Sequence, residues 1–149
     1  MSDPRSCIFC TIIAGNGDAS VVHRDELVTA FMDIHPVNDG HTLIVPNIHS
    51  TGLENIDEAT GGRMFNVACR IAAAMPSAGI RREGLNLFLA DGAVAGQTVF
   101  HAHLHVLPRH SGDPFRVQIE SLKRSAPARS VLDKQARVLA DMLGSSTVR

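Results

Sequence analysis

The 149-residue sequence predicts an α+β domain whose sheet is mostly antiparallel. Short runs of β-branched and apolar residues lie between turns rich in Gly, Pro and Asp, as strands do. Two longer stretches repeat apolar residues at spacings of three and four, as amphipathic helices do. The segment FHAHLHVLPRH alternates histidines with small or apolar residues, which is the period of a strand. A chain of this length suits one domain with its own core, over residues 1–149.

Four strands are predicted, and the first two form a hairpin. The turn at residues 35–41 joins them, and it contains Pro36 and the pair Asp39-Gly40, which are residue types that favour turns. The third and fourth strands follow a helical stretch, and the fourth carries the alternating histidines. The predicted strands are residues 28–34, 42–45, 85–89 and 98–107.

Two amphipathic helices complete the predicted elements. Residues 57–75 form the first, because Asp57 suits the positive end of a helix and Pro76 stops its far end. Cys69, within this helix, is expected to be a small buried apolar residue. The apolar stripe of this helix contains Met64, Val67, Ala68, Ile71, Ala72 and Met75.

The second helix is predicted over residues 130–143. Ser130 can cap its start and Gly144 can end it. Residues 110–129, which precede it, contain Pro, Gly and several basic residues without a clear period. We expect a loop there, with at most one short strand or helical turn.

Composition and charge exclude several classes of protein. Hydrophobic residues make up 44% and charged residues 19% of the chain, which is ordinary for a globular domain. A net charge of −1 argues against a nucleic acid or an anionic membrane as the main partner. No apolar run approaches the roughly 20 residues that span a bilayer. The first residues, MSDPRSC, lack the basic and apolar regions of a secretory signal, so the cytoplasm is the expected location.

Three histidines, His101, His103 and His105, occupy every second position. In a strand they share one face and lie about 6–7 Å apart. Imidazoles so close repel one another when charged, so at least two are expected to be neutral near pH 7, the form that attacks or binds metals. The pattern allows a catalytic face, a metal site, or a polar face of an exposed strand. Phe100, Ala102, Leu104 and Val106 take the other face and are expected to enter the core.

The loop before the histidines favours chemistry at a phosphate. Gly96 lets the backbone approach a ligand closely. Gln97 and Thr98 add an amide and a hydroxyl that can donate hydrogen bonds. Backbone N–H groups in such a bend suit phosphate oxygens. By itself this loop is an ordinary turn, but beside three aligned histidines it suggests a phosphate site.

The three cysteines do not indicate a disulfide framework, because three is an odd number. Cys7 and Cys10 have the C-x-x-C spacing, which suits two thiolates on one tetrahedral ion or a redox pair. The plainer interpretation is a pair of reduced thiols without a ligand near the N-terminus.

The segment GQTVFHAHLHVLPR resembles the signature of the histidine triad (HIT) family of nucleotide hydrolases and transferases. FMDIHPVNDGHTLIVPNIH resembles the family's first motif block, and CIFCTII resembles its N-terminal entry segment. The resemblance implies a HIT-like fold: a mostly antiparallel five-stranded sheet with two main helices, pairing into a homodimer. The triad core then covers about residues 7–110, and residues 111–149 form a C-terminal loop and helix.

The resemblance also implies an enzyme that hydrolyses purine nucleotide conjugates, such as nucleoside phosphoramidates or dinucleoside polyphosphates, at the α-phosphate. His103 matches the nucleophile that forms a covalent nucleotidyl-histidine, and a backbone carbonyl is expected to fix its tautomer. His105 matches a phosphate ligand, Thr98 a hydroxyl that assists the leaving group, and Gln97 a neighbour of the phosphate. Asp33 matches the position that binds the ribose hydroxyls. The apolar purine pocket matches Ile8, Phe9, Met32 and Ile34.

One position departs from the family pattern. Seven residues before Gln97 the family usually carries Asn or Gln, and this chain carries Ala90, which cannot donate a hydrogen bond to the phosphate. The resemblance at His105 points to a hydrolase, since transferase branches tend to carry Gln there. Ala90 favours an alternative, a nucleotide-binding or sensor protein with weak or vestigial activity. A further alternative is a zinc protein whose triad serves structure only.

The resemblance extends to a metal. Some bacterial-type members hold a structural zinc with two N-terminal cysteines, the first triad histidine and a histidine beside it. These positions match Cys7, Cys10, His101 and His49. Such a site leaves His103 and His105 free of metal. The remaining histidines are expected to lie in turns or on the surface: His23, His35, His41 and His110.

Overall fold

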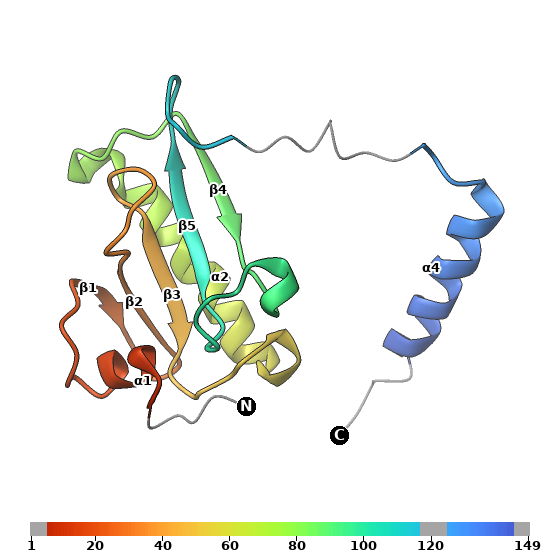
Figure 1. The fold of residues 1–149 in the computed structure, drawn as a ribbon, viewed down its shortest axis with the longest axis horizontal. Helices are drawn as coiled ribbons and strands as arrows, with labels where there is room; N and C mark the ends of the chain where they lie inside the picture. The colour runs from red at the N-terminus through yellow and green to blue at the C-terminus, as the bar shows by residue number, and fades with distance from the viewer. Residues whose placement is uncertain (1–5, 117–124, 145–149) are drawn as a thin grey trace. The chain divides into compact units, whose positions relative to one another are not determined.

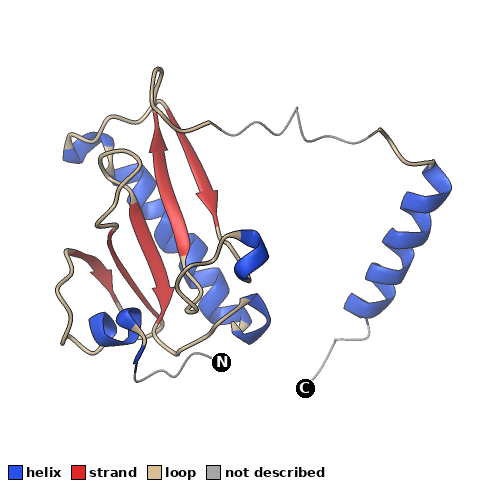
Figure 2. Cartoon of the chain, viewed as in Figure 1, coloured by secondary structure: helices blue, strands red, loops and turns tan. Residues whose placement is uncertain are grey.

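The computed structural model describes residues 6–116 and 125–144. The chain forms two compact units, Met1–Phe115 and Arg116–Arg149. The first unit contains a five-stranded sheet with helices (Figures 1 and 2). This is the α+β, HIT-like architecture that the sequence predicts.

The five strands lie in the order β1-β2-β3-β5-β4, and every neighbouring pair is antiparallel. The predicted hairpin is present as β2 and β3. Strand β5, which carries His105, lies between β3 and the edge strand β4 (Figure 1). The strands are β1 (Val21–Arg24), β2 (Val28–Met32), β3 (Thr42–Pro46), β4 (Gly84–Phe88) and β5 (Leu104–Arg109).

Helix α2 (Glu58–Ala74) covers one face of the sheet (Figure 1). Asp57 is its N-cap, since its carboxylate accepts a hydrogen bond from the backbone N–H of Thr60 at 2.9 Å. The predicted apolar stripe of α2 faces the strands. Alternate residues of each strand point toward it, because successive side chains of a strand lie on opposite faces of the sheet. The buried residues of this core are Val28, Ala30, Ile44, Met64, Val67, Ala68, Met75 and Val106.

Helix α1 (Ile8–Ile13) packs on the opposite face of the sheet. Phe9 and Ile12 are buried against Phe31 and Leu43, which point away from α2. The rings of Phe9 and Phe31 meet edge to face, with centroids 5.4 Å apart. This small second core fixes α1 beside the histidines.

Two regular elements are missing from the sequence prediction. Strand β1 is only four residues long and mostly exposed, so it has no buried run to detect. Helix α1 is also short, and packing against the sheet rather than helix propensity stabilises a helix of this length.

The fourth predicted strand starts too early. Strand β5 begins at Leu104, so His101 and His103 lie in the loop before it. Phe100 is wrongly predicted as a core residue, because it is 43% exposed ahead of the strand. Cys69 is also wrongly predicted as buried, since it lies on the exposed side of α2.

The second unit contains helix α4 (Arg129–Gly144), and all of its residues are exposed. The helix begins one residue before Ser130, so the predicted cap at Ser130 is wrong. Residues 110–116 and 125–128 form no helix or strand, as predicted, while residues 117–124 lie outside the described part of the chain. The exposed apolar residues of α4 include Val131, Leu132, Val138, Leu139, Met142 and Leu143.

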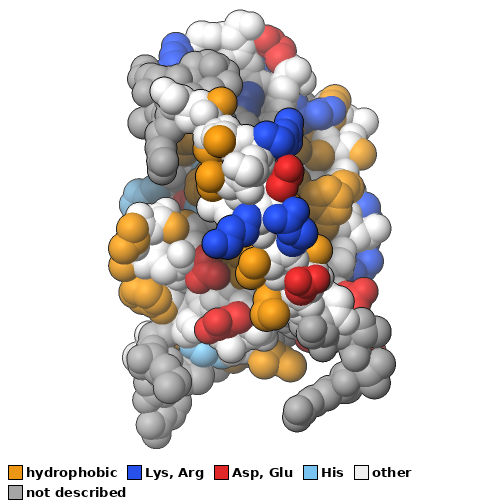
Figure 3. Space-filling view, turned by 90° about the vertical axis from the view of Figure 1, so that its right-hand side faces the viewer, with side chains coloured by type: hydrophobic (Ala, Val, Ile, Leu, Met, Phe, Trp, Pro, Cys, Tyr) orange, Lys and Arg blue, Asp and Glu red, His pale blue; other side chains and the backbone are white. Residues whose placement is uncertain are grey.

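Charges of both signs are mixed on the surface. Figure 3 shows Lys and Arg side chains as well as Asp and Glu side chains on one face, with hydrophobic ones among them. This mixture agrees with the net charge of −1. Within the described ranges, no helix combines the length and the apolar character needed to cross a bilayer.

An ion pair ties the end of β5 to the loop that follows. Arg109 donates two hydrogen bonds to Asp113, at 2.7 and 2.8 Å, and Asp113 is 1% exposed. Asn38, from the turn after β2, donates to the same carboxylate at 3.0 Å. These hydrogen bonds, those from Arg109 first, hold the pKa of Asp113 well below its usual range.

We expect Asp113→Asn to lower the melting temperature by roughly 5–10 °C at pH 7, because Arg109 loses its anionic partner. A depressed pKa in the folded state stabilises the protein above the unfolded pKa of about 3.9 and ceases to do so as pH falls through the folded pKa. The difference from the unchanged protein should therefore shrink below about pH 4, as thermal unfolding at several pH values can measure. Asp39→Asn, at an exposed position, is the matched control; an equal loss there would contradict the assignment.

Candidate active site and metal cluster

A cavity of about 330 Å³ opens between α1 and the sheet face that carries Phe31 and Leu43. This volume suits a small ligand of nucleotide size. Eight residues singled out in the sequence line it: Ile8, Phe9, Met32, Asp33, Ile34, Thr98, His103 and His105. The cavity also has walls that the sequence did not indicate, namely Ile12, Asp18, Ala19, Phe31, His35, Leu43 and Val99.

His103 lines this cavity, and the backbone holds one nitrogen of its ring. Its Nδ1 lies 2.7 Å from the backbone carbonyl oxygen of His101, and only a protonated Nδ1 can donate to that carbonyl. In the neutral ring, Nε2 therefore keeps its lone pair. The side chain is 5% exposed, and Phe9 packs edge to face against it with centroids 5.3 Å apart. A carbonyl at this nitrogen is the arrangement that the sequence predicts.

His105 takes the opposite tautomer. The backbone N–H of Val37 donates to Nδ1 of His41 at 3.3 Å, so His41 carries its proton on Nε2. That Nε2–H donates to Nδ1 of His105 at 2.9 Å, and His105 is left with its own proton on Nε2. Two histidines on one wall thus present different groups: a lone pair on His103 and an N–H donor on His105.

His41 lies at the end of the turn after β2, which agrees with the sequence prediction, but it is buried and not a surface residue. It is 3% exposed, and its Nε2 also lies 3.6 Å from Asp33 Oδ2. Burial lowers the pKa of His41, and the nearby Asp33 carboxylate opposes that shift. Burial, followed by the neighbouring His103 and His41, lowers the pKa of His105 to about 4. Both rings are therefore neutral near pH 7, as the hydrogen-bond chain requires.

The loop before the histidines is held by Gln97. Its carbonyl oxygen accepts from the N–H of Gly92 at 2.8 Å, and its amide donates to the carbonyls of Thr51 and Val99 at 2.8 and 3.1 Å. The side chain is 5% exposed and does not line the cavity, so its described contacts are within the protein. Gly96 has φ +89°, a left-handed conformation that favours glycine. Thr98 is exposed at the cavity wall.

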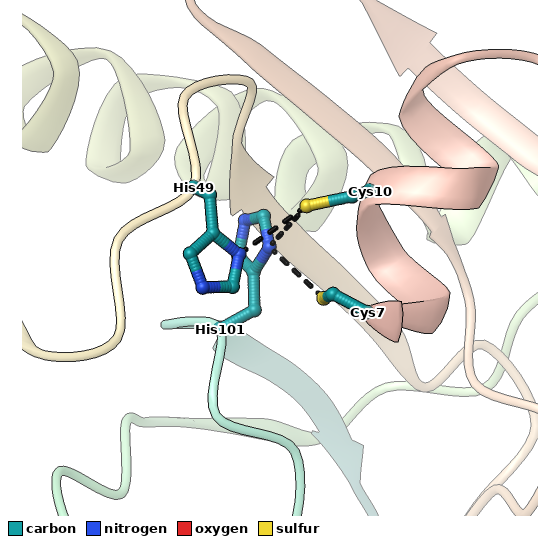
Figure 4. Close-up of side chains that lie close together, drawn as sticks. All are labelled: Cys7, Cys10, His49 and His101. Atoms are coloured by element: carbon teal, nitrogen blue, oxygen red, sulfur yellow. Dashed lines mark hydrogen bonds between the residues drawn. The ribbon is translucent and has the colours of Figure 1, made fainter. Parts of the chain in front are cut away.

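A second group of side chains lies beside the cavity. Cys7 and Cys10, from the start of α1, face His101 and His49 (Figure 4). One donor atom of each residue lies within 4.8 Å of the others. Cys10 Sγ is 3.2 Å from Nδ1 of His49 and 3.6 Å from Nδ1 of His101, and Cys7 Sγ is 3.5 Å from Nδ1 of His101.

These distances fit a tetrahedral zinc ion. Bonds of ~2.3 Å to sulfur and ~2.0 Å to nitrogen hold the two kinds of atom about 3.5 Å apart. Nε2 of the buried His101 donates to the backbone carbonyl of Pro46 at 2.9 Å, so Nδ1 is unprotonated and faces the thiols. Burial lowers the pKa of His101 to about 4. Burial and the adjacent Cys7 raise the pKa of the Cys10 thiol to about 11, so a cation is needed for both sulfurs to ionise.

Fold and site together define an α+β protein with a histidine-lined cavity of nucleotide size. The HIT domain family matches residues 14–112, and the chain belongs to that family. A HIT-like protein of Borreliella burgdorferi is 43% identical over 110 residues, which are 73% of this chain and 79% of that protein. Adenylylsulfatase HINT3 of Arabidopsis thaliana is 33% identical over 135 residues, which are 91% of this chain and 66% of that protein.

Solved structures agree with this assignment. A Zn-bound histidine triad family protein from Mycobacterium smegmatis has a TM-score of 0.72 at 35% identity, covering 97% of this chain and 99% of that one. A protein of Streptococcus mutans UA159 has a TM-score of 0.82 at 33% identity, covering 93% of this chain and 85% of that one.

Proposed function

We propose that the protein hydrolyses purine nucleotide conjugates at the α-phosphate through a covalent intermediate on His103. The observation that carries the proposal is the pair of opposite tautomers, with a lone pair on His103 and an N–H on His105 at one cavity wall. A nucleophile and a donor are the two groups that displacement at phosphorus needs.

The reaction would run in two displacements. Nε2 of His103 attacks the α-phosphorus, and the bond from phosphorus to the leaving nitrogen or oxygen breaks. His105 donates to a non-bridging phosphate oxygen, where charge builds up. The exposed hydroxyl of Thr98 donates a hydrogen bond to the leaving group, which departs with a proton taken from solvent and later returned by the attacking water. Water then displaces the histidine, releases a nucleoside monophosphate and restores the neutral ring.

The cavity offers a matching place for the nucleoside. Ile8, Phe9, Met32 and Ile34 supply apolar surface for a purine, and the Asp33 carboxylate can accept hydrogen bonds from ribose hydroxyls. Gln97 contributes in this proposal by holding the loop that carries Thr98. A contact from Gln97 to the phosphate stays a prediction.

A screen of adenosine and guanosine phosphoramidates and dinucleoside polyphosphates, followed by monophosphate release, tests the function. We expect turnover of at least one class, with the monophosphate as product. Binding of a monophosphate without turnover of any substrate would contradict the hydrolase and support a nucleotide-binding or sensor protein. Ala90 is the observation that favours this second candidate, since it supplies no amide to the phosphate.

We further propose that Cys7, Cys10, His49 and His101 hold a structural zinc ion. The four donors satisfy a closed tetrahedral shell, so no position is left for a substrate. Bound there, zinc would fix α1, and with it the pocket residues Ile8 and Phe9, to the histidine loop.

We also propose a homodimer. Strand β4 could form its interface, because β4 lies at one edge of the sheet and has β5 as its neighbour on the other side.

We expect Ala90→Asn to raise kcat for a nucleoside phosphoramidate by roughly tenfold, because the new amide donates to the phosphate as charge develops. Steady-state kinetics on one substrate measure the effect. Ala90→Val adds similar bulk without a donor and should give no gain. Equal rates for Ala90→Asn and the unchanged protein would mean that another group already supplies this hydrogen bond.

A further inference from the structure

Phe88 is a partly exposed aromatic residue beside His105, the proposed hydrogen-bond donor to the phosphate. It ends the edge strand β4, and its ring stacks on the imidazole of His105 with centroids 4.1 Å apart and planes 7° from parallel. The ring is nevertheless 40% exposed. Because His105 covers one face of the ring, the exposed surface lies on its edges and its other face.

The register of the sheet places Phe88 in a row with the cavity. Phe31 on β2 pairs with Leu43 on β3, Leu43 pairs with His105 on β5, and His105 pairs with Phe88 on β4. Cross-strand partners share a face, and strands lie ~4.8 Å apart, so the row extends for about 14 Å. Leu85 and Leu87 point to the opposite face, where they pack toward α2.

The order of groups in this row matches the order of groups in a nucleotide conjugate. Phe31 and Leu43 line the nucleoside cavity, His105 with His103 marks the phosphate, and Phe88 lies beyond them outside the cavity lining. A conjugate whose nucleoside occupies the cavity therefore directs its leaving group toward β4.

The residues two positions either side of Phe88 offer little hydrogen bonding to a ligand. Ala90, two residues on, carries only a methyl group. Asn86, two residues before Phe88 on the same strand face, accepts a hydrogen bond from Arg109 at 2.5 Å, so its amide oxygen is engaged at the far end of the strand. A flat ring can stack on Phe88, whereas the one polar side chain of β4, Asn86, has its amide oxygen engaged by Arg109.

We propose, on the basis of the proposed function, that Phe88 is a specificity-determining residue that stacks on an aromatic leaving group. The preferred substrates then carry a planar ring, either an arylalkyl amine or a second nucleobase, beyond the bond that breaks. The His105 imidazole, Phe88 and this ring form a three-layer stack, and parallel aromatic layers attract one another when they are offset.

Matched conjugates of adenosine monophosphate test the proposal in the full-length protein. One carries an arylethyl amine on phosphorus and the other a straight-chain alkyl amine of similar length. We expect the unchanged protein to prefer the aryl conjugate by about five- to tenfold in kcat/KM, mainly through KM. Phe88→Leu should bring this ratio close to 1, while Phe88→Tyr should keep it. Phe65→Leu, at an exposed aromatic residue of α2, is the control.

Each outcome decides the proposal. An equal loss of kcat/KM for both conjugates in Phe88→Leu would overturn the stacking role. Light scattering would then show whether the ring supports a subunit contact, if the oligomeric state changes, or only His105, if it does not. Turnover of both conjugates with no preference in the unchanged protein would overturn the stacking role and leave the hydrolase intact. Turnover of neither would overturn the proposed function itself. Comparing diadenosine triphosphate with adenosine triphosphate distinguishes a nucleobase from an arylalkyl amine as the ring.

Discussion

We expect His103→Ala to lower kcat/KM for a nucleoside phosphoramidate by about 10⁴-fold or more, because a nucleophile and its covalent intermediate are lost together. Binding of the nucleoside monophosphate should change only a few-fold. The apolar pocket and Asp33 stay in place, and titration calorimetry with the monophosphate can measure this. In the unchanged protein, rapid quenching of a labelled substrate at alkaline pH should trap the nucleotide on His103.

His110→Ala is the matched control, since this histidine is not among the residues that line the cavity. His103→Gln, which keeps side-chain volume and a polar end, separates loss of the nucleophile from loss of local structure. Near-normal turnover in either His103 variant, or label trapped on His105 instead, would contradict the assignment of the nucleophile.

Loss of zinc should have the second large effect, on stability and on substrate binding. We expect about one zinc ion per chain in protein made in zinc-containing medium. Cys10→Ser should remove it and lower the melting temperature by roughly 10 °C, because the metal–ligand bonds that fasten α1 are lost. KM should rise as well, since Ile8 and Phe9 on α1 line the cavity. Elemental analysis, thermal unfolding and kinetics measure the three effects.

Cys69→Ser changes an exposed cysteine of α2 outside the cluster and should leave zinc content and stability as they are. Zinc content and melting temperature can both be measured without any substrate. Zinc-free protein from zinc-containing medium, with a melting temperature that Cys10→Ser does not change, would contradict a structural metal site.

Sequence periodicity was sufficient for the larger elements. Strands β2, β3, β4 and β5 and helices α2 and α4 lie where the apolar patterns predict them, with ends shifted by one or a few residues. The largest shift is at β5, where alternating residues 98–103 share the period of a strand but have no partner strand. Alternation reports which side a residue faces, whereas a strand also needs a neighbour to bond with, and only the fold supplies one.

Some residues of the candidate site can be identified from sequence motifs, and others only from the fold. The motif selects His101, His103 and His105, and the C-x-x-C spacing selects Cys7 and Cys10. His41 was misjudged because nothing local distinguishes it: it lies in a turn, and its burial and its bond to His105 arise from the pairing of β3 with β5.

The sequence by itself determined the fold class, the set of chemistry-bearing residues and the net charge of −1. These properties depend on residue types and local spacing, which a sequence displays directly. Only the tertiary structure decided which ring nitrogens of His41, His103 and His105 are engaged by hydrogen bonds, and that Phe88 lies across from His105. Both depend on which atoms from distant parts of the chain meet, and strand register brings residues 41, 88 and 105 together.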